Sequence, residues 1–215
     1  MIPTNAAPGL RIVVLSAGYS ARLGSAKALA RIRGVTLLRK TVRALSPLSA
    51  GRIIVVLPPR ASRARAELRG HRVDFAESRH RSRGLSASVK CGLLRARYSA
   101  GILFLPVDLA CLDPRELARA VARWQSSRRT VVARRVGARA GTPLILPRRL
   151  YPRAGRIGGD LGLRDLVNAL PRDEVTLIEL PCAALDVDTR EDLRRARRRH
   201  RGLQQPDRLL DLRRL

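Results

Sequence analysis

The sequence predicts an α/β fold, in which helices cover both faces of a mostly parallel sheet. Strand-like and helix-like segments alternate along the chain. The strand-like segments are continuous apolar runs, such as Ile-Ile-Val-Val-Leu at residues 53–57, as expected for strands buried on both faces. A length of 215 residues and a hydrophobic content of 45% suit one domain with a substantial core.

The predicted strands are short apolar runs that end at glycine, proline or charged residues. The run at 53–57, for example, stops at Pro58-Pro59. In chain order, strands are predicted at Leu10–Leu15, Arg52–Leu57, Val73–Ala76, Gly101–Val107, Thr130–Arg135, Thr142–Leu146 and Val175–Leu180.

The predicted helices show apolar residues at helical spacing or clear end signals. Thr36–Leu45 places four aliphatic side chains on one face, and Pro47 ends it. A second helix begins with Asp113 as its N-cap and Pro114 at its first position. The helices predicted in addition to Thr36–Leu45 are Ala61–Arg69, Gly84–Arg97, Asp113–Trp124 and Thr189–His200. We expect a flexible N-terminus (1–8), one domain (9–200) and a basic C-terminal tail (201–215).

The net charge of +27 comes from 41 arginines and 3 lysines spread over the whole chain. A strongly basic chain is typical of nucleic-acid-binding proteins. The sequence contains no helix-turn-helix, zinc-finger or RNA-recognition signature, and only 3% of its residues are aromatic. We therefore favour the solvated basic surface of an enzyme with anionic substrates, and nucleic acid is not an expected partner.

The cysteines indicate a reducing compartment. None of the three has C-x-x-C spacing and their number is odd: Cys91, Cys111 and Cys182. No leader peptide is recognisable, and no apolar run approaches the roughly 20 residues that span a bilayer. The sequence therefore predicts a cytoplasmic protein without a membrane partner.

The loop after the first strand has the composition of an anion-binding site. It reads L-S-A-G-Y-S-A-R-L-G-S-A-K over residues 15–27. Backbone N–H groups of small residues, together with Arg and Lys side chains, suit phosphate binding. The loop is not a Walker motif, and its glycines are too far apart for the dinucleotide fingerprint. We expect it to bind a nucleoside triphosphate through Leu15, Ser16, Ala17, Gly18, Gly24 and Lys27.

Carboxylates follow later strands. Residues 1–66 contain 12 Lys and Arg but no Asp or Glu, whereas Asp108 directly follows a strand-like segment and Asp186 and Asp188 lie beyond the end of another. Ligands of open α/β sheets bind at the carboxyl ends of the strands, and Mg²⁺ prefers oxygen ligands. We therefore predict a Mg²⁺ site on Asp108 and Asp186. A turn role for Asp108 and a helix cap at Asp188 are the structural alternatives.

A third segment, Gly84–Leu93, opens a helix with G-L-S-A-S. Backbone N–H groups and hydroxyls at a helix start are suited to holding a base, ribose or phosphate. Gly84, Ser86 and Ser88 are therefore candidate nucleotide-binding residues, and an ordinary N-terminal cap is the alternative.

These segments resemble the MobA-like nucleotidyltransferases. The family signature L-A-A-G-x-S-x-R-x-G-x-x-K matches residues 15–27, with Ser16 as the one departure. The family pattern G-M-S-x-S-L-x-x-G-L is similar to residues 84–93. Ala17 and the G-L-S-x-S element look closest to the molybdenum cofactor cytidylyltransferase branch, since the guanylyltransferase branch has glycines at positions 17 and 18.

The resemblance extends from about residue 11 to 196. Asp108–Leu112 is similar to D-x-P-x-L, with Ala110 in place of Pro. Residues 141–144 and 158–164 look like the G-x-P and G-D-x-G-A-R elements. Residues 186–193 resemble D-I-D-T-P-E-D-L, with Arg in place of Pro.

The resemblance implies a three-layer α/β/α Rossmann-like (GT-A-like) nucleotidyltransferase fold and Mg²⁺-dependent transfer of CMP from CTP. The implied acceptor is phosphorylated molybdopterin, pyrophosphate is released, and a molybdoenzyme receives the product. Arg22, Lys27 and Asp108 would be catalytic. Asp160 and Arg164 would lie on the acceptor side, although a structural salt bridge explains them equally well.

Two other functions fit the sequence. One is nucleotidyl transfer to a sugar phosphate or a phospholactate, because no decisive acceptor signature is present. The other is a non-catalytic nucleic-acid-binding protein on the same fold, which would account for the net charge of +27.

Overall fold

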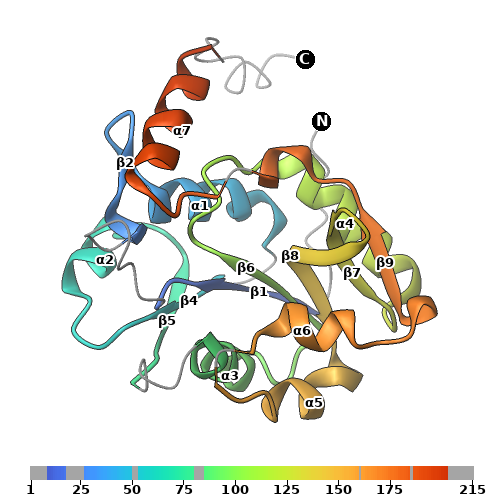
Figure 1. Cartoon of the computed structure of the whole chain (residues 1–215). Coiled ribbons are helices and arrows are strands. Elements are labelled where there is room, and N and C mark those ends of the chain that lie inside the picture. Colours follow the sequence, from blue (N-terminus) through green and yellow to red (C-terminus); the bar gives the residue numbers. More distant parts are fainter. Residues whose placement is uncertain are drawn as a thin grey trace, which may run out of the picture.

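A seven-stranded sheet with the order β5-β4-β1-β6-β8-β7-β9 forms the centre of the molecule (Figure 1). The structure is a computed structural model that describes residues 9–17, 27–49, 53–79, 85–159, 161–184 and 186–202. The strands of this sheet are β1 (Leu10–Leu15), β4 (Ile53–Leu57), β5 (Val73–Glu77), β6 (Gly101–Pro106), β7 (Val131–Val136), β8 (Arg139–Pro147) and β9 (Val175–Ile178).

Six of these strands run in one direction and β8 runs in the other. β5, β4, β1 and β6 pair in parallel, and so do β7 and β9, whereas β8 is antiparallel to both β6 and β7. β7 and β8 are joined by a tight turn at Gly137, whose φ of 59° favours glycine. A turn this short can only join antiparallel strands.

Helices cover both faces of the sheet, which confirms the predicted three-layer α/β/α fold (Figure 1). The helices are α1 (Leu37–Leu45), α2 (Ser62–Glu67), α3 (Leu85–Arg95), α4 (Pro114–Ser127), α5 (Tyr151–Gly155), α6 (Leu163–Asn168) and α7 (Arg190–Gly202). Short 3-10 helices are η1 (Lys27–Leu29), η2 (Ser46–Leu48), η4 (Arg148–Leu150), η5 (Arg172–Glu174) and η6 (Pro181–Ala184).

The alternation of side chains along β1 divides the core in two. Ile12 and Val14 pack with α1, α2 and α4, whereas Val13 packs with α3, α5 and α6. The helices of these two layers lie on opposite sides of the sheet in Figure 1. Strands with apolar side chains on both faces are the reason for the continuous apolar runs in the sequence.

Several elements differ from the sequence-based prediction. The strand predicted at Thr142–Leu146 is the longer β8, and nothing in the pattern indicated that it is antiparallel. The structure also contains elements that were not predicted. One is a small hairpin of β2 (Arg31–Ile32) and β3 (Val35–Thr36), whose strands of two residues are too short to show a pattern. The others are the helices α5 and α6, whose five and six residues contain too few turns to show a helical period. The expected termini, 1–8 and most of 201–215, lie outside the described residues. Over the described part of the chain, no helix is both long enough and apolar enough to cross a membrane.

Helix α3 approaches the sheet closely at Gly92. A Cβ atom there would lie 2.5 Å from Val13 Cγ1 and 3.4 Å from Val56 Cγ2. The absence of a side chain therefore sets the distance between α3 and strands β1 and β4.

We predict that Gly92→Ala lowers the free energy of unfolding by about 1–3 kcal/mol, because the extra methyl group overpacks the core. Urea unfolding followed by circular dichroism measures the change. Gly155→Ala is the matched control, since its Cβ would meet only Leu93 Cδ2, at 3.8 Å. Equal stability of the two variants would contradict this account of the packing.

Candidate functional site

The candidate site lies at the carboxyl ends of β1 and β6. These parallel strands are neighbours, and the Val107 N–H donates to Leu15 O at 3.1 Å beyond their last pair. β1 is followed by β4 and β5 on one side, while β6 lies on its other side, so the strand order reverses here. Ligands of open α/β sheets bind in the crevice at such a reversal.

Lys27 lies at the centre of a group of carboxylates. Its Nζ is 3.1 Å from Asp108 Oδ2 and also donates to Asp188 Oδ1. Burial lowers the pKa of Lys27, but hydrogen bonds and ion pairs with Asp188 and Asp108 outweigh it, so the pKa is raised above 10.5. The amine is therefore a fixed positive charge at neutral pH.

Backbone contacts bring the three aspartates together. Leu109 and Asp186 form an isolated antiparallel bridge, and the Val187 N–H donates to Asp108 O at 2.9 Å. The end of β6 and the segment before α7 are thereby held side by side.

The helix cap next to Asp188 is made by Thr189. The N–H and hydroxyl of Thr189 donate to Asp192 Oδ2, while Thr189 Oγ1 accepts from the Asp192 N–H. This reciprocal cap replaces the capping role considered for Asp188 and leaves the Asp188 side chain to pair with Lys27.

A small apolar cluster lies beneath these charges. Its buried members are Ala30, Ile32, Leu37, Ala110, Val187 and Ala196. Val187, between Asp186 and Asp188, is fully buried in it. The cluster joins the β2–β3 hairpin, the start of α1, the loop after β6 and α7 into one support for the site.

The surroundings of Asp186 disfavour its charged form. Partial burial, Asp108 and Asp188 together raise its pKa above the ordinary 3.8, although Arg134 and Lys27 act in the opposite direction. Asp108 Oδ1 is buried and, among the described residues, has no hydrogen-bond partner. The carboxylates of Asp108 and Asp186 offer oxygen ligands, as a hard divalent cation such as Mg²⁺ or Mn²⁺ requires, and Asp108 Oδ1 is available to bind it. These residues therefore fit the predicted metal.

Arg134 is a site residue that sequence reasoning missed. It follows a bulge between Ala133 and Arg134 in β7, where it stays paired with Gly141 of β8 and Ile178 of β9, and its Nη1 donates to Ala183 O. There it lowers the pKa of Asp186. With 41 arginines in the chain, no sequence signal distinguishes this one.

The structure describes the two ends of the predicted phosphate loop, residues 15–17 and Lys27. Ala17 is buried, and the buried Ser16 Oγ has no hydrogen-bond partner among the described residues. The predicted residues Gly18, Arg22 and Gly24 lie outside the described residues, as do Gly84 and Asp160.

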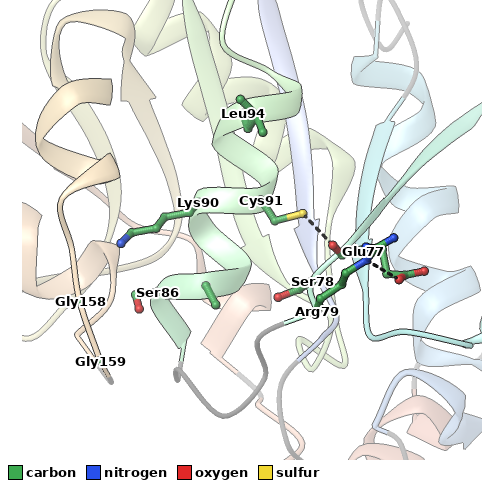
Figure 2. A pocket seen from close by; sticks show the side chains of 10 residues that line it. Glu77, Ser78, Arg79, Ser86, Lys90, Cys91, Leu94, Gly158 and Gly159 are labelled. Carbon is green, nitrogen blue, oxygen red and sulfur yellow. Dashed lines mark hydrogen bonds and ion pairs between the residues drawn. The ribbon is translucent and has the colours of Figure 1, made fainter.

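A pocket of about 630 Å³ opens beside α3, at the same edge of the sheet (Figure 2). Its walls come from the end of β5, from α3 and from the loop at Gly158–Gly159. Of the predicted residues, Ser86 lines it and its N–H donates to Gly159 O at 3.4 Å, whereas the buried Ser88 does not line it. Lys27 and Asp108 lie outside the pocket lining.

Figure 2 shows cationic side chains on two sides of this pocket. Lys90 extends from α3 toward Gly158, while Arg79 lies across the pocket beside Glu77, to which it is paired at 3.3 Å. Arg164 is exposed on α6 and is not part of the lining. The carboxyl-end edge of the sheet thus carries both a charged centre and a pocket.

Comparison with known proteins assigns the family. The family model of the MobA-like NTP transferase domain matches residues 12–175. The chain belongs to this family. Together with the fold, the match identifies the chain as a nucleotidyltransferase. A search of curated proteins finds no match.

Solved structures agree with the family assignment. Rv0371c from Mycobacterium tuberculosis H37Rv is 28% identical, with a TM-score of 0.73 over 89% of this chain and 99% of that one. Mth528, a nucleotidyl transferase from Methanothermobacter thermautotroptrophicus, is 23% identical (TM-score 0.76; 90% and 98% covered). Molybdopterin-guanine dinucleotide biosynthesis protein A from Archaeoglobus fulgidus is 13% identical (TM-score 0.66; 90% and 100% covered). The last two similarities show the fold alone.

We predict that Asp186→Asn raises the free energy of unfolding at pH 7, by at most about 1 kcal/mol because the group is partly exposed and screened. A carboxyl with a raised pKa in the folded state destabilises the protein above that pKa, and the penalty disappears as pH falls toward 3.8. Urea unfolding at pH 7 and near pH 4 measures both effects. Asp188→Asn, which loses an ion pair with Lys27, serves as the comparison, and an equal gain there would contradict the prediction.

Proposed function

We propose that this protein transfers CMP from CTP to a phosphorylated acceptor of the molybdopterin type, with release of pyrophosphate. The observation that supports it most is the convergence of Lys27, Asp108 and Asp186 at the reversal of strand order. Transfer between two anions needs charge neutralisation and alignment more than a covalent nucleophile. In the proposal, an oxygen of the acceptor phosphate bonds to the α-phosphorus as the bond to pyrophosphate breaks.

The chain's own groups have distinct tasks in this proposal. Lys27, already held between two carboxylates, would exchange one of them for a phosphate oxygen and neutralise the charge that builds there. Arg22 would act beside it, and the backbone at Leu15, Ser16 and Ala17, with Gly18 and Gly24, would bind the triphosphate. The Ser16 hydroxyl offers a buried donor at this point.

Asp108 and Asp186 would hold Mg²⁺, which supplies Lewis-acid charge stabilisation at the phosphates when it is bound. Asp108 Oδ1, which has no hydrogen-bond partner in the described part of the chain, and the raised pKa of Asp186 support this choice. The crystal structure of Rv0371c in complex with manganese is similar to this chain, with 27% identity and a TM-score of 0.70 over 88% of this chain and 98% of that one. This similarity is consistent with a divalent metal in the proposed site.

The pocket beside α3 would hold the remaining parts of the two substrates. Gly84 and Ser86 would fix the nucleoside, with the buried Ser88 supporting the start of α3 behind them, while Lys90 and Arg79 provide positive charge for an anionic acceptor. Asp160 and Arg164 would shape the acceptor side. We place the reaction in the cytoplasm, in keeping with three free cysteines, and propose that a molybdoenzyme receives the product.

Pyrophosphate release tests this proposal. The protein is incubated with Mg²⁺ and each of CTP, GTP, ATP and UTP, with and without molybdenum cofactor. We expect release only with CTP and the cofactor together. If pyrophosphate is released with a sugar phosphate or a phospholactate instead, the proposed acceptor is wrong. If another triphosphate is preferred over CTP, the assignment as a cytidylyltransferase is wrong.

Variants test the residue roles. We predict that Lys27→Ala and Asp108→Asn each lower kcat about 100-fold or more, since each removes a group that stabilises charge at the phosphates. The exposed Asp173 in η5 is far from the site in the sheet order, so Asp173→Asn is the matched control and should retain full activity. Near-normal turnover by either site variant, with circular dichroism unchanged, would show that the site is misassigned.

A further inference from the structure

Outside the candidate active site, metal-binding side chains gather at the start of α4. Ligand atoms of Asp113, Glu116 and Cys182 all lie within 4.8 Å of one another, and these are the residues of the described chain that meet this condition. A second thiol, that of Cys111, interacts with the Cys182 thiol. The three mutually close residues therefore supply one sulfur and two carboxylate donors, and the Cys111 thiol, which contacts the Cys182 thiol, is a candidate fourth donor.

Backbone contacts fix this arrangement. Asp113 is the N-cap of α4 and accepts from the Arg115 N–H at 2.8 Å, and Glu116 lies in the first turn of the same helix. Cys182 comes from η6, far away in sequence, and its N–H donates to both carboxylate oxygens of Glu116, at 3.1 and 3.3 Å. Each carboxylate oxygen has two lone pairs, so these bonds leave acceptor capacity for a cation.

The local charges favour a cation. The carboxylates of Asp113 and Glu116 lie close to each other and to the Cys182 sulfur. A divalent cation bound among these atoms would offset the repulsion between the two carboxylates.

We propose that Cys111, Asp113, Glu116 and Cys182 form a binding site for a divalent cation of borderline softness, such as Zn²⁺. Four donors of sulfur and oxygen match the coordination number and ligand types of structural zinc sites. On binding, each metal–sulfur bond replaces an S–H bond, and the thiol proton passes to solvent.

The position of this site suggests a structural role. Cys111 follows Asp108 by three residues, and Cys182 precedes Asp186 by four. A cation held by both cysteines would join the two segments that deliver the active-site aspartates, at a point separate from Lys27. The proposal does not depend on which nucleotide or acceptor the enzyme uses.

Titration of the reduced, metal-free full chain with Co²⁺ tests the site. We expect a thiolate-to-cobalt charge-transfer band that saturates at one equivalent and that Zn²⁺ abolishes by displacement. Cys111→Ser and Cys182→Ser should lose the band. Cys91→Ser, in which the third cysteine is changed on α3, and Asp108→Asn should keep it, which separates this site from the active-site aspartates. A band that persists in Cys182→Ser would overturn the proposal.

Two measurements on the wild-type chain remain decisive if a variant fails to fold. Zn²⁺ at about 100 times its Kd should raise the Tm by roughly 5 °C or more. It should also protect two of the three thiols from a disulfide reagent. Three freely reactive thiols in excess Zn²⁺, or rapid formation of a Cys111–Cys182 disulfide with hydrogen peroxide that Zn²⁺ does not slow, would show that the cysteines do not bind a cation.

Discussion

The position of the Lys27 ammonium between Asp108 and Asp188 is the interaction on which the site depends. Three segments far apart in the sequence meet there, and each would otherwise bring an uncompensated charge to a partly buried crevice. Paired charges are tolerated in such a place because each partner offsets the desolvation of the other. The apolar cluster around Val187 supplies the rigidity that this pairing needs.

Most strands of the sheet could be predicted from the sequence. Strands buried on both faces must be apolar throughout, so β1, β4 and β6 were predictable to within about one residue. The direction of β8 was not, since antiparallel and parallel central strands share the same composition. Helices as short as α5 owe their existence to tertiary packing rather than to local periodicity.

For the site, the sequence indicated which charged residues lie at this edge of the sheet but not which of them pair with one another. The strand-end rule placed Asp108 and the loop that ends at Lys27 at the same edge of the sheet, and in the structure Lys27 Nζ lies 3.1 Å from Asp108 Oδ2. The sequence left open whether Asp188 caps α7 or contributes to the site. In the structure, reciprocal hydrogen bonds between Thr189 and Asp192 cap the helix, and Asp188 pairs with Lys27. Arg134 was beyond sequence reasoning, because its position is set by a bulge in β7.

The last helix has a consequence for how this chain tolerates change. α7 looks like a basic appendage, yet Ala196 is fully buried against the cluster that contains Val187, so the helix acts as a buttress for the aspartate segment. Substitution of its outward-facing arginines would be nearly neutral, whereas a larger side chain in place of Ala196 would disturb the cluster that supports Asp186 and Asp188. Tolerance to substitution along α7 should therefore follow the helical period.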